Sequence, residues 1–144
     1  MGVAFDTRPS RCANVSAAFP QLVYIIEDDQ SVRTGLLRLM HSAELSARAY
    51  ADAQSFFDDV TTESQGCVLL DMTMPLLNGL EVQAWMNARG IRIPVIALSA
   101  RDDDETRLRA RELGAKFFLR KPVDDQALLD SISWVLGARA SADD

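Results

Sequence analysis

Short apolar runs alternate along the chain with stretches that repeat apolar residues at helical spacing. Three of the runs, at 22–26, 67–71 and 94–100, read "LVYII", "CVLLD" and "PVIALSA". Their length and their β-branched character predict strands buried on both faces. Segments 45–50 and 116–122 predict two further strands, and the weak alternation of the first is typical of a sheet edge.

Five amphipathic stretches follow these strands, one after each. Asp52 is a suitable N-cap for the second, and Gly90 and Gly114 suit the ends of the third and fourth. Strands that alternate with amphipathic helices imply an α/β fold, in which a parallel sheet is covered by helices on both faces. The predicted helices cover 30–43, 53–60, 80–90, 101–114 and 124–137.

The 144 residues suit one domain, and the net charge of −6 makes no case for binding nucleic acid or an anionic membrane. No apolar run approaches the ~20 residues of a membrane helix. We expect a flexible leader at 1–20, a folded domain at 21–137, and a linker or tail at 138–144. Cys67 opens an apolar run and should be buried, whereas Cys12 lies in the polar leader as a free thiol, which fits a reduced cytosolic setting.

Polar residues follow four of the five predicted strands. Glu27 and Asp28 come after the first strand, Asp71 ends the third, Ser99 ends the fourth, and Lys121 follows the fifth. The carboxyl ends of parallel strands meet at one edge of the sheet, where ligands bind in open α/β folds. These five residues should therefore face one crevice.

The chemistry of this set favours a hard cation and a phosphoryl group. Three neighbouring carboxylates repel one another unless a cation lies among them, and an incomplete oxygen shell suits Mg²⁺. A lysine and a metal ion can hold a phosphoryl group, Ser99 can donate a hydrogen bond to it, and an aspartate can become an acyl phosphate. Taken singly, each of these residues also has a simpler interpretation. The acid pair suits a helix N-terminus, Ser99 suits a helix cap, and the Lys-Pro pair suits a turn. The prediction of a phosphoryl site therefore depends on their joint placement after four of the strands.

These segments resemble the receiver domain of two-component response regulators. The resemblance covers roughly residues 21–137 and includes "IIEDD", "LLDMTMPLLNG", "PVIALSA" and "FFLRKP". It implies a flavodoxin-like fold, with a five-stranded parallel sheet in the order 2-1-3-4-5 and five helices on both faces.

The resemblance also implies roles for the polar residues. Asp71 would be the phosphoacceptor, and Asp28 would bind Mg²⁺ directly. Glu27 would hold the metal through water, and the backbone carbonyl of Thr73 would complete the protein ligands. Glu27 stands where aspartate is commoner, and its longer side chain should be tolerated in a water-mediated role.

A conformational switch is implied as well. Ser99, where threonine is commoner, would bond the phosphoryl group, and Lys121 would pair with it. Phe118 would turn inward as Ser99 moves, which is a shift between two existing states. In this family, the positions two past Asp71 and two past Ser99, here Thr73 and Arg101, tune the loss of phosphate.

The implied partner is a sensor histidine kinase, and the implied location of this domain is the cytoplasm. A phosphorylation-dependent homodimer could form through the fourth helix, fifth strand and fifth helix. The domain itself would bind neither nucleic acid nor membrane. The pattern is most similar to receivers of transcriptional regulators with a C-terminal helix-turn-helix domain. A stand-alone receiver that acts through protein contacts is the alternative.

Two other classes of function stay open at this point. One is a phosphohydrolase with an aspartyl nucleophile, although such enzymes commonly carry a second acid where this chain has Thr73. The other is a binding module that has lost phosphorylation, which should lack one of the key residues. Because all of them are present, we favour a phosphorylation switch that assists its own modification, and not an enzyme that turns over a metabolite.

Three smaller signals have simpler interpretations. His41, the only histidine, should lie on the surface late in the first helix. Trp85 and Trp134 fall on apolar helix faces, which predicts core or interface positions and favours the core.

Overall fold

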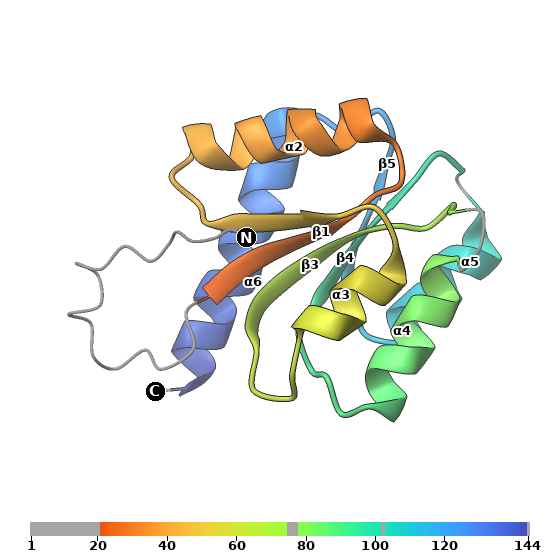
Figure 1. The fold of residues 1–144 in the computed structure, drawn as a ribbon. Helices are drawn as coiled ribbons and strands as arrows, with labels where there is room; N and C mark the ends of the chain where they lie inside the picture. Colours follow the sequence, from red (N-terminus) through yellow and green to blue (C-terminus); the bar gives the residue numbers. More distant parts are fainter. Residues whose placement is uncertain (1–20, 75–77, 102, 144) are drawn as a thin grey trace.

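The computed structural model describes residues 21–74, 78–101 and 103–143, with side chains described up to residue 137. Five strands alternate with five helices along this part of the chain (Figure 1). The strands are β1 (Gln21–Ile26), β2 (Ala47–Tyr50), β3 (Gln65–Asp71), β4 (Val95–Ser99) and β5 (Ala115–Arg120). The helices are α2 (Gln30–Ser42), α3 (Ala53–Asp59), α4 (Gly79–Ala88), α5 (Asp104–Glu112) and α6 (Asp125–Asp143).

All five strands belong to one parallel sheet, in the order β2-β1-β3-β4-β5. This confirms the predicted flavodoxin-like order 2-1-3-4-5 and the position of 45–50 at an edge. The central strands are the most apolar because they are covered on both faces, and β4 is buried along its whole length.

The sheet separates two apolar cores, since side chains alternate between its faces. Helices α3, α4 and α5 cover one face, and α2 and α6 cover the other (Figure 1). Phe56 fills the first core, where its ring meets those of Tyr24 and Tyr50 at 5.7 Å between centroids. The second core contains Cys67, which is fully buried as predicted, and burial raises the pKa of its thiol to about 12. Cys12 lies outside the described residues.

Several predicted helix ends are confirmed by their local geometry. Asp52 caps α3 by accepting a hydrogen bond from the Ser55 amide at 2.8 Å. Gly90 and Gly114 follow α4 and α5 with φ values of 72° and 117°, which side chains disfavour. Helix α6 continues to Asp143, so residues 138–143 are helical, and their role as a linker or tail stays a prediction.

The tryptophans do not lie in the core, so that prediction was wrong. Trp85 is 42% exposed and Trp134 is 61% exposed. On α4, Val82 and Met86 face the sheet, while Trp85 lies at the flank of the stripe against Phe57 of α3, with ring centroids 5.8 Å apart. His41 is exposed, as expected. No helix in the described ranges is long and apolar enough to cross a membrane.

Candidate phosphoacceptor and cation site

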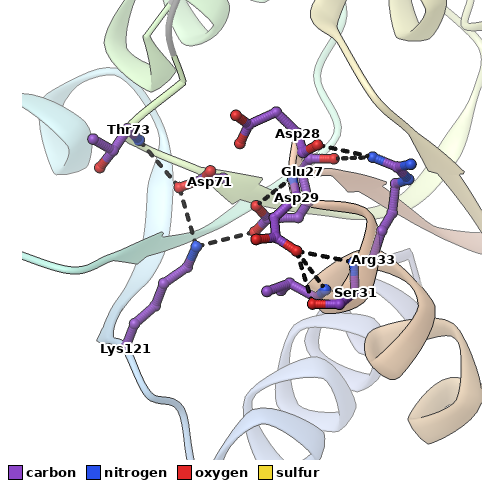
Figure 2. A network of polar contacts seen from close by, with 9 residues as sticks. Glu27, Asp28, Asp29, Ser31, Arg33, Asp71, Thr73 and Lys121 are labelled. Carbon is purple, nitrogen blue, oxygen red and sulfur yellow. Dashed lines mark hydrogen bonds and ion pairs between the residues drawn. The ribbon is translucent and has the colours of Figure 1, made fainter.

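The acidic site begins where β1 and β3 end side by side. Ile26 pairs with Leu70 in the register of the two strands, so the next residue of each strand, Glu27 and Asp71, reaches the same edge. Both are buried, at 2% and 3% exposure, whereas Asp28 is exposed. One carboxylate oxygen from each of the three acids lies within 4.8 Å of the others. The three acids predicted to share a crevice therefore do so (Figure 2).

Lys121 reaches the acids from the end of β5, an edge strand of the sheet. Its amide donates to the Ser99 carbonyl at 2.8 Å, which continues the pairing of β5 with β4 beyond the end of β5. Its Nζ lies 3.0 Å from Glu27 Oε1 and 3.3 Å from Asp71 Oδ1 (Figure 2). One ammonium group thus bridges the two buried carboxylates.

Burial and charge act against each other in this cluster. Burial raises the pKa of Glu27 above its usual value, and the charge of Asp71 adds to this, although the hydrogen bond from Lys121 opposes it. Burial alone would lower the pKa of Lys121, but its hydrogen bond to Glu27 and the charges of Asp71 and Glu27 raise it overall. The cluster holds three acids against one lysine and so retains a net negative charge.

A divalent cation fits this donor set. Carboxylate oxygens suit hard cations, and Asp28 presents its carboxylate to solvent beside the buried pair. The Thr73 amide donates to Asp71 Oδ1 at 3.1 Å, which orients the Asp71 carboxylate at the edge of the sheet. The residues present are thus consistent with a divalent metal site.

Two residues, Asp29 and Arg33, hold the loop from β1 to α2 through contacts that we did not predict from the sequence. Asp29 caps α2 by accepting from the amides of Ser31 and Val32 at 2.9 and 3.1 Å, and its own amide donates to Glu27 Oε2 at 3.2 Å. The pattern of an acid just before a helical stripe could have identified this cap. Arg33 Nη1 donates to the backbone carbonyl of Glu27 at 2.9 Å and to that of Asp28 at 3.2 Å, and no sequence pattern indicates this contact.

Ser99 lies at the end of β4, on the strand next to Asp71. Leu98 is the register partner of Asp71, so Ser99 lies one residue beyond it. Its side chain is buried, and its Oγ accepts from the Arg101 amide at 3.1 Å. The Arg101 amide is the donor of this bond, so the hydroxyl hydrogen of Ser99 remains available to donate. The bond lies in the turn after β4 and does not cap a helix, since Asp103 is the N-cap of α5, and the interpretation of Ser99 as a helix cap was therefore wrong.

Phe118, the expected switch residue, is half-buried on β5. It pairs in register with Ala97 and packs against the core that α3, α4 and α5 cover. The guanidinium carbon of Arg107, on α5, lies 5.2 Å from the centroid of its ring. The aromatic side chain therefore connects β5 with α5, on the side of the sheet that holds that core.

Comparison with known proteins identifies the family. The profile described as "Response regulator receiver domain" matches residues 23–133. The chain belongs to this family. It is a receiver domain of a two-component response regulator, a phosphorylation switch rather than an enzyme in the ordinary sense, and it carries the acidic pocket of Glu27, Asp28 and Asp71.

The receiver is similar to the receiver parts of longer regulators. It is 37% identical over 114 residues to the transcriptional regulatory protein TdiR of Thauera aromatica, covering 79% of this chain and 50% of TdiR. It is 36% identical over 118 residues to the transcriptional regulatory protein FixJ of Azorhizobium caulinodans, covering 82% and 56%. The chain thus spans about half the length of these curated relatives.

Solved structures agree with the fold. The response regulator StyR superposes with a TM-score of 0.78 at 37% identity, covering 85% of this chain and 62% of StyR. Full-length FixJ from B. japonicum gives 0.74 at 33% identity, covering 81% and 58%.

Proposed function

We propose that Asp71 is the phosphoacceptor of this receiver, that the receiver works in the cytoplasm, and that Asp71 takes a phosphoryl group from a sensor histidine kinase. The observation that carries the proposal is the buried Asp71 carboxylate at the end of β3, 3.3 Å from Lys121 Nζ and beside two further acids. In the transfer, the N–P bond of the phosphohistidine breaks and a bond forms between the phosphorus and a carboxylate oxygen of Asp71. The imidazole leaves with the bonding electrons and takes up a proton.

The surrounding residues would bind the metal ion and the phosphoryl group. Glu27, Asp28, Asp71 and the backbone carbonyl of Thr73 would hold Mg²⁺, which when bound neutralises charge on the phosphoryl oxygens. Lys121 moves its ion pair from the Asp71 carboxylate to the phosphoryl group.

The switch would start from Ser99. Its hydroxyl, held by the Arg101 amide, donates to the new phosphoryl group, and its movement makes room for Phe118 to turn inward. The change would alter the surface formed by α5, β5 and α6. Leu108 of α5 and Trp134 of α6 are 57% and 61% exposed, so this surface offers apolar side chains for a homodimer. Because TdiR and FixJ are named as transcriptional regulatory proteins, we propose that the output controls transcription.

Phosphorylation of Asp71 can be tested with acetyl phosphate and MgCl2. Wild type should gain one phosphoryl group by intact mass, the group should be released by hydroxylamine, and Asp71→Asn should gain none. Asp58→Asn is the matched control, since Asp58 is an exposed aspartate on α3 that accepts a bond only from Gln54 among the described contacts. A hydroxylamine-sensitive phosphoryl group that persists in Asp71→Asn would exclude Asp71 as the acceptor.

The output surface can be tested by light scattering after beryllofluoride treatment. We expect dimers from wild type and monomers from Leu108→Glu, which should still be phosphorylated by acetyl phosphate. Dimers that Leu108→Glu forms equally well would place the interface elsewhere.

A further inference from the structure

Arg33 connects the first turn of α2 to the loop that carries two of the acids. Its Nη1 donates to the backbone carbonyls of Glu27 and Asp28, at 2.9 and 3.2 Å (Figure 2). These carbonyls lie just beyond the end of β1, where the Glu27 amide still donates to the Tyr50 carbonyl at 3.1 Å and the described contacts of the two carbonyls come from Arg33. One side chain therefore holds two consecutive peptide groups, the one between Glu27 and Asp28 and the one between Asp28 and Asp29.

The rest of the loop is held from the same helix. Asp29 caps α2, and its amide donates to Glu27 Oε2 at 3.2 Å. The amide of Arg33 itself donates to the Asp29 carbonyl at 2.9 Å. Backbone and side-chain contacts from one helical turn thus determine where Glu27 and Asp28 point.

We infer that Arg33 is a positioning residue for the cation site: it holds Glu27 and Asp28 in the arrangement that binds a divalent cation. This inference rests on the proposed Mg²⁺-dependent function. Groups that hydrogen-bond to metal-binding residues orient them, and losing one typically weakens metal affinity 10- to 100-fold. Because Arg33 holds backbone and not the ligand atoms themselves, we expect an effect at the lower end, about tenfold.

The sign of the effect separates positioning from simple electrostatics. A positive guanidinium beside a cation site repels the cation, so charge alone would make removal of Arg33 strengthen binding. Positioning predicts the opposite, that binding weakens. A merely structural role would lower the melting temperature of the metal-free domain and leave the affinity unchanged.

The experiment is calorimetric titration with MgCl2, repeated with MnCl2, on wild type and three variants. Arg33→Met removes both the donors and the charge, and should weaken binding about tenfold. Arg33→Lys keeps a positive donor of similar reach and should recover most of the affinity. Arg38→Met is the matched control, since Arg38 is an exposed arginine on the same helix, and it should bind as wild type does.

A double-mutant cycle with Asp28→Asn tests whether Arg33 acts through the loop. If it does, Arg33→Met should weaken binding far less once the Asp28 ligand is lost. Unchanged or tighter binding by Arg33→Met, or fully additive effects in the cycle, would overturn the inference and leave the proposed function standing. If Arg33→Met fails to fold, Arg33→Lys in the same cycle decides the matter. A wild type that binds neither metal would instead overturn the proposed cation site, and the inference with it.

Discussion

Replacing Lys121 with methionine should make the stability of this receiver depend more strongly on both pH and Mg²⁺. Lys121 Nζ lies 3.0 Å from Glu27 and 3.3 Å from Asp71, and the two acids are almost fully buried. Methionine keeps much of the apolar stem and removes the charge. Two adjacent carboxylates then lack the only cation that the described structure places between them.

Two energies limit the loss of stability in Lys121→Met: the energy of the lost ion pair and the free energy of protonating Glu27. At 3.0 Å, a unit charge pair is worth about 5 kcal/mol at an effective dielectric constant of ~20, before the desolvation of lysine is subtracted. The domain can instead protonate Glu27, which at pH 7 costs at most about 4 kcal/mol, or ~1.4 kcal/mol for each pH unit above the usual pKa of glutamate. Because Lys121 is partly exposed, we expect Lys121→Met to lower the free energy of unfolding by about 2–3 kcal/mol without metal, or ~10 °C in melting temperature.

The pH dependence has a definite sign. The pKa of Glu27 in the folded protein is already above its usual value, through burial first and the charge of Asp71 second. A raised carboxyl pKa stabilises the fold below the usual pKa, and that contribution is lost as pH rises through the raised value. Without Lys121 the pKa rises further, so stability should fall more steeply with pH above the usual value than it does in wild type.

Urea unfolding from pH 4.5 to 8, in EDTA and in MgCl2, measures the loss of stability, its dependence on pH and its dependence on Mg²⁺. Mg²⁺ should restore much of the lost stability at pH 7, because the cation takes over the role of Lys121. Lys116→Met, on an exposed lysine of β5, the strand that Lys121 follows, should change little in either buffer. Equal stability of Lys121→Met and wild type at pH 7 in EDTA, with parallel pH profiles, would refute this account of the cluster.

Three further predictions concern residues of β3 and α2. Gly66→Ala should destabilise the domain by several kcal/mol or prevent folding, because its Cβ would lie 1.8 Å from the Leu22 carbonyl oxygen and φ is 132°. Gly35→Ala, with open space in α2, should instead stabilise by ~0.5–1 kcal/mol, and thermal melts compare the two. In a Cys12→Ser background, Cys67 should resist iodoacetamide until the protein unfolds, since it is buried with a thiol pKa of about 12; rapid labelling of the native state would contradict this.

The strands could be predicted from the sequence because the features that form them are local. A buried parallel strand needs a short apolar run, and 22–26, 67–71 and 94–100 supply this without reference to the rest of the chain. The ends differ by one or two residues, as at β3, which begins at Gln65 because Gly66 can approach Leu22 closely. The strand order was not local information, and it came from the resemblance to receivers.

The site could be predicted only as far as strand ends determine it. Parallel strands bring Glu27, Asp71 and Lys121 to one edge whatever their rotamers, so their proximity followed from the fold class. The contacts of Arg33 depend on how one helical turn packs over one loop, and no residue spacing encodes that. The exposure of Trp85 was missed for a related reason. The spacing of apolar residues predicts which face of a helix is apolar, but it does not show which residues lie at the edge of that face. Trp85 lies at this edge, where Phe57 and Arg89 contact its ring.

The burial of the Glu27 carboxylate lowers the stability of the fold, and it also makes the site suited to binding a divalent cation. Glu27 would be more easily buried as a neutral residue, and its raised pKa measures the preference of its surroundings for the protonated form. A divalent cation reverses that preference, so binding it should stabilise the fold and favour the ionised carboxylates at the same time. The contacts from Arg33 and Asp29 hold the loop that carries Glu27 and Asp28, while Lys121 pairs with Glu27. A receiver that kept Glu27 but lost the contacts of Arg33 should bind Mg²⁺ less tightly whatever its change in stability, which makes metal affinity the more direct measure of the loop.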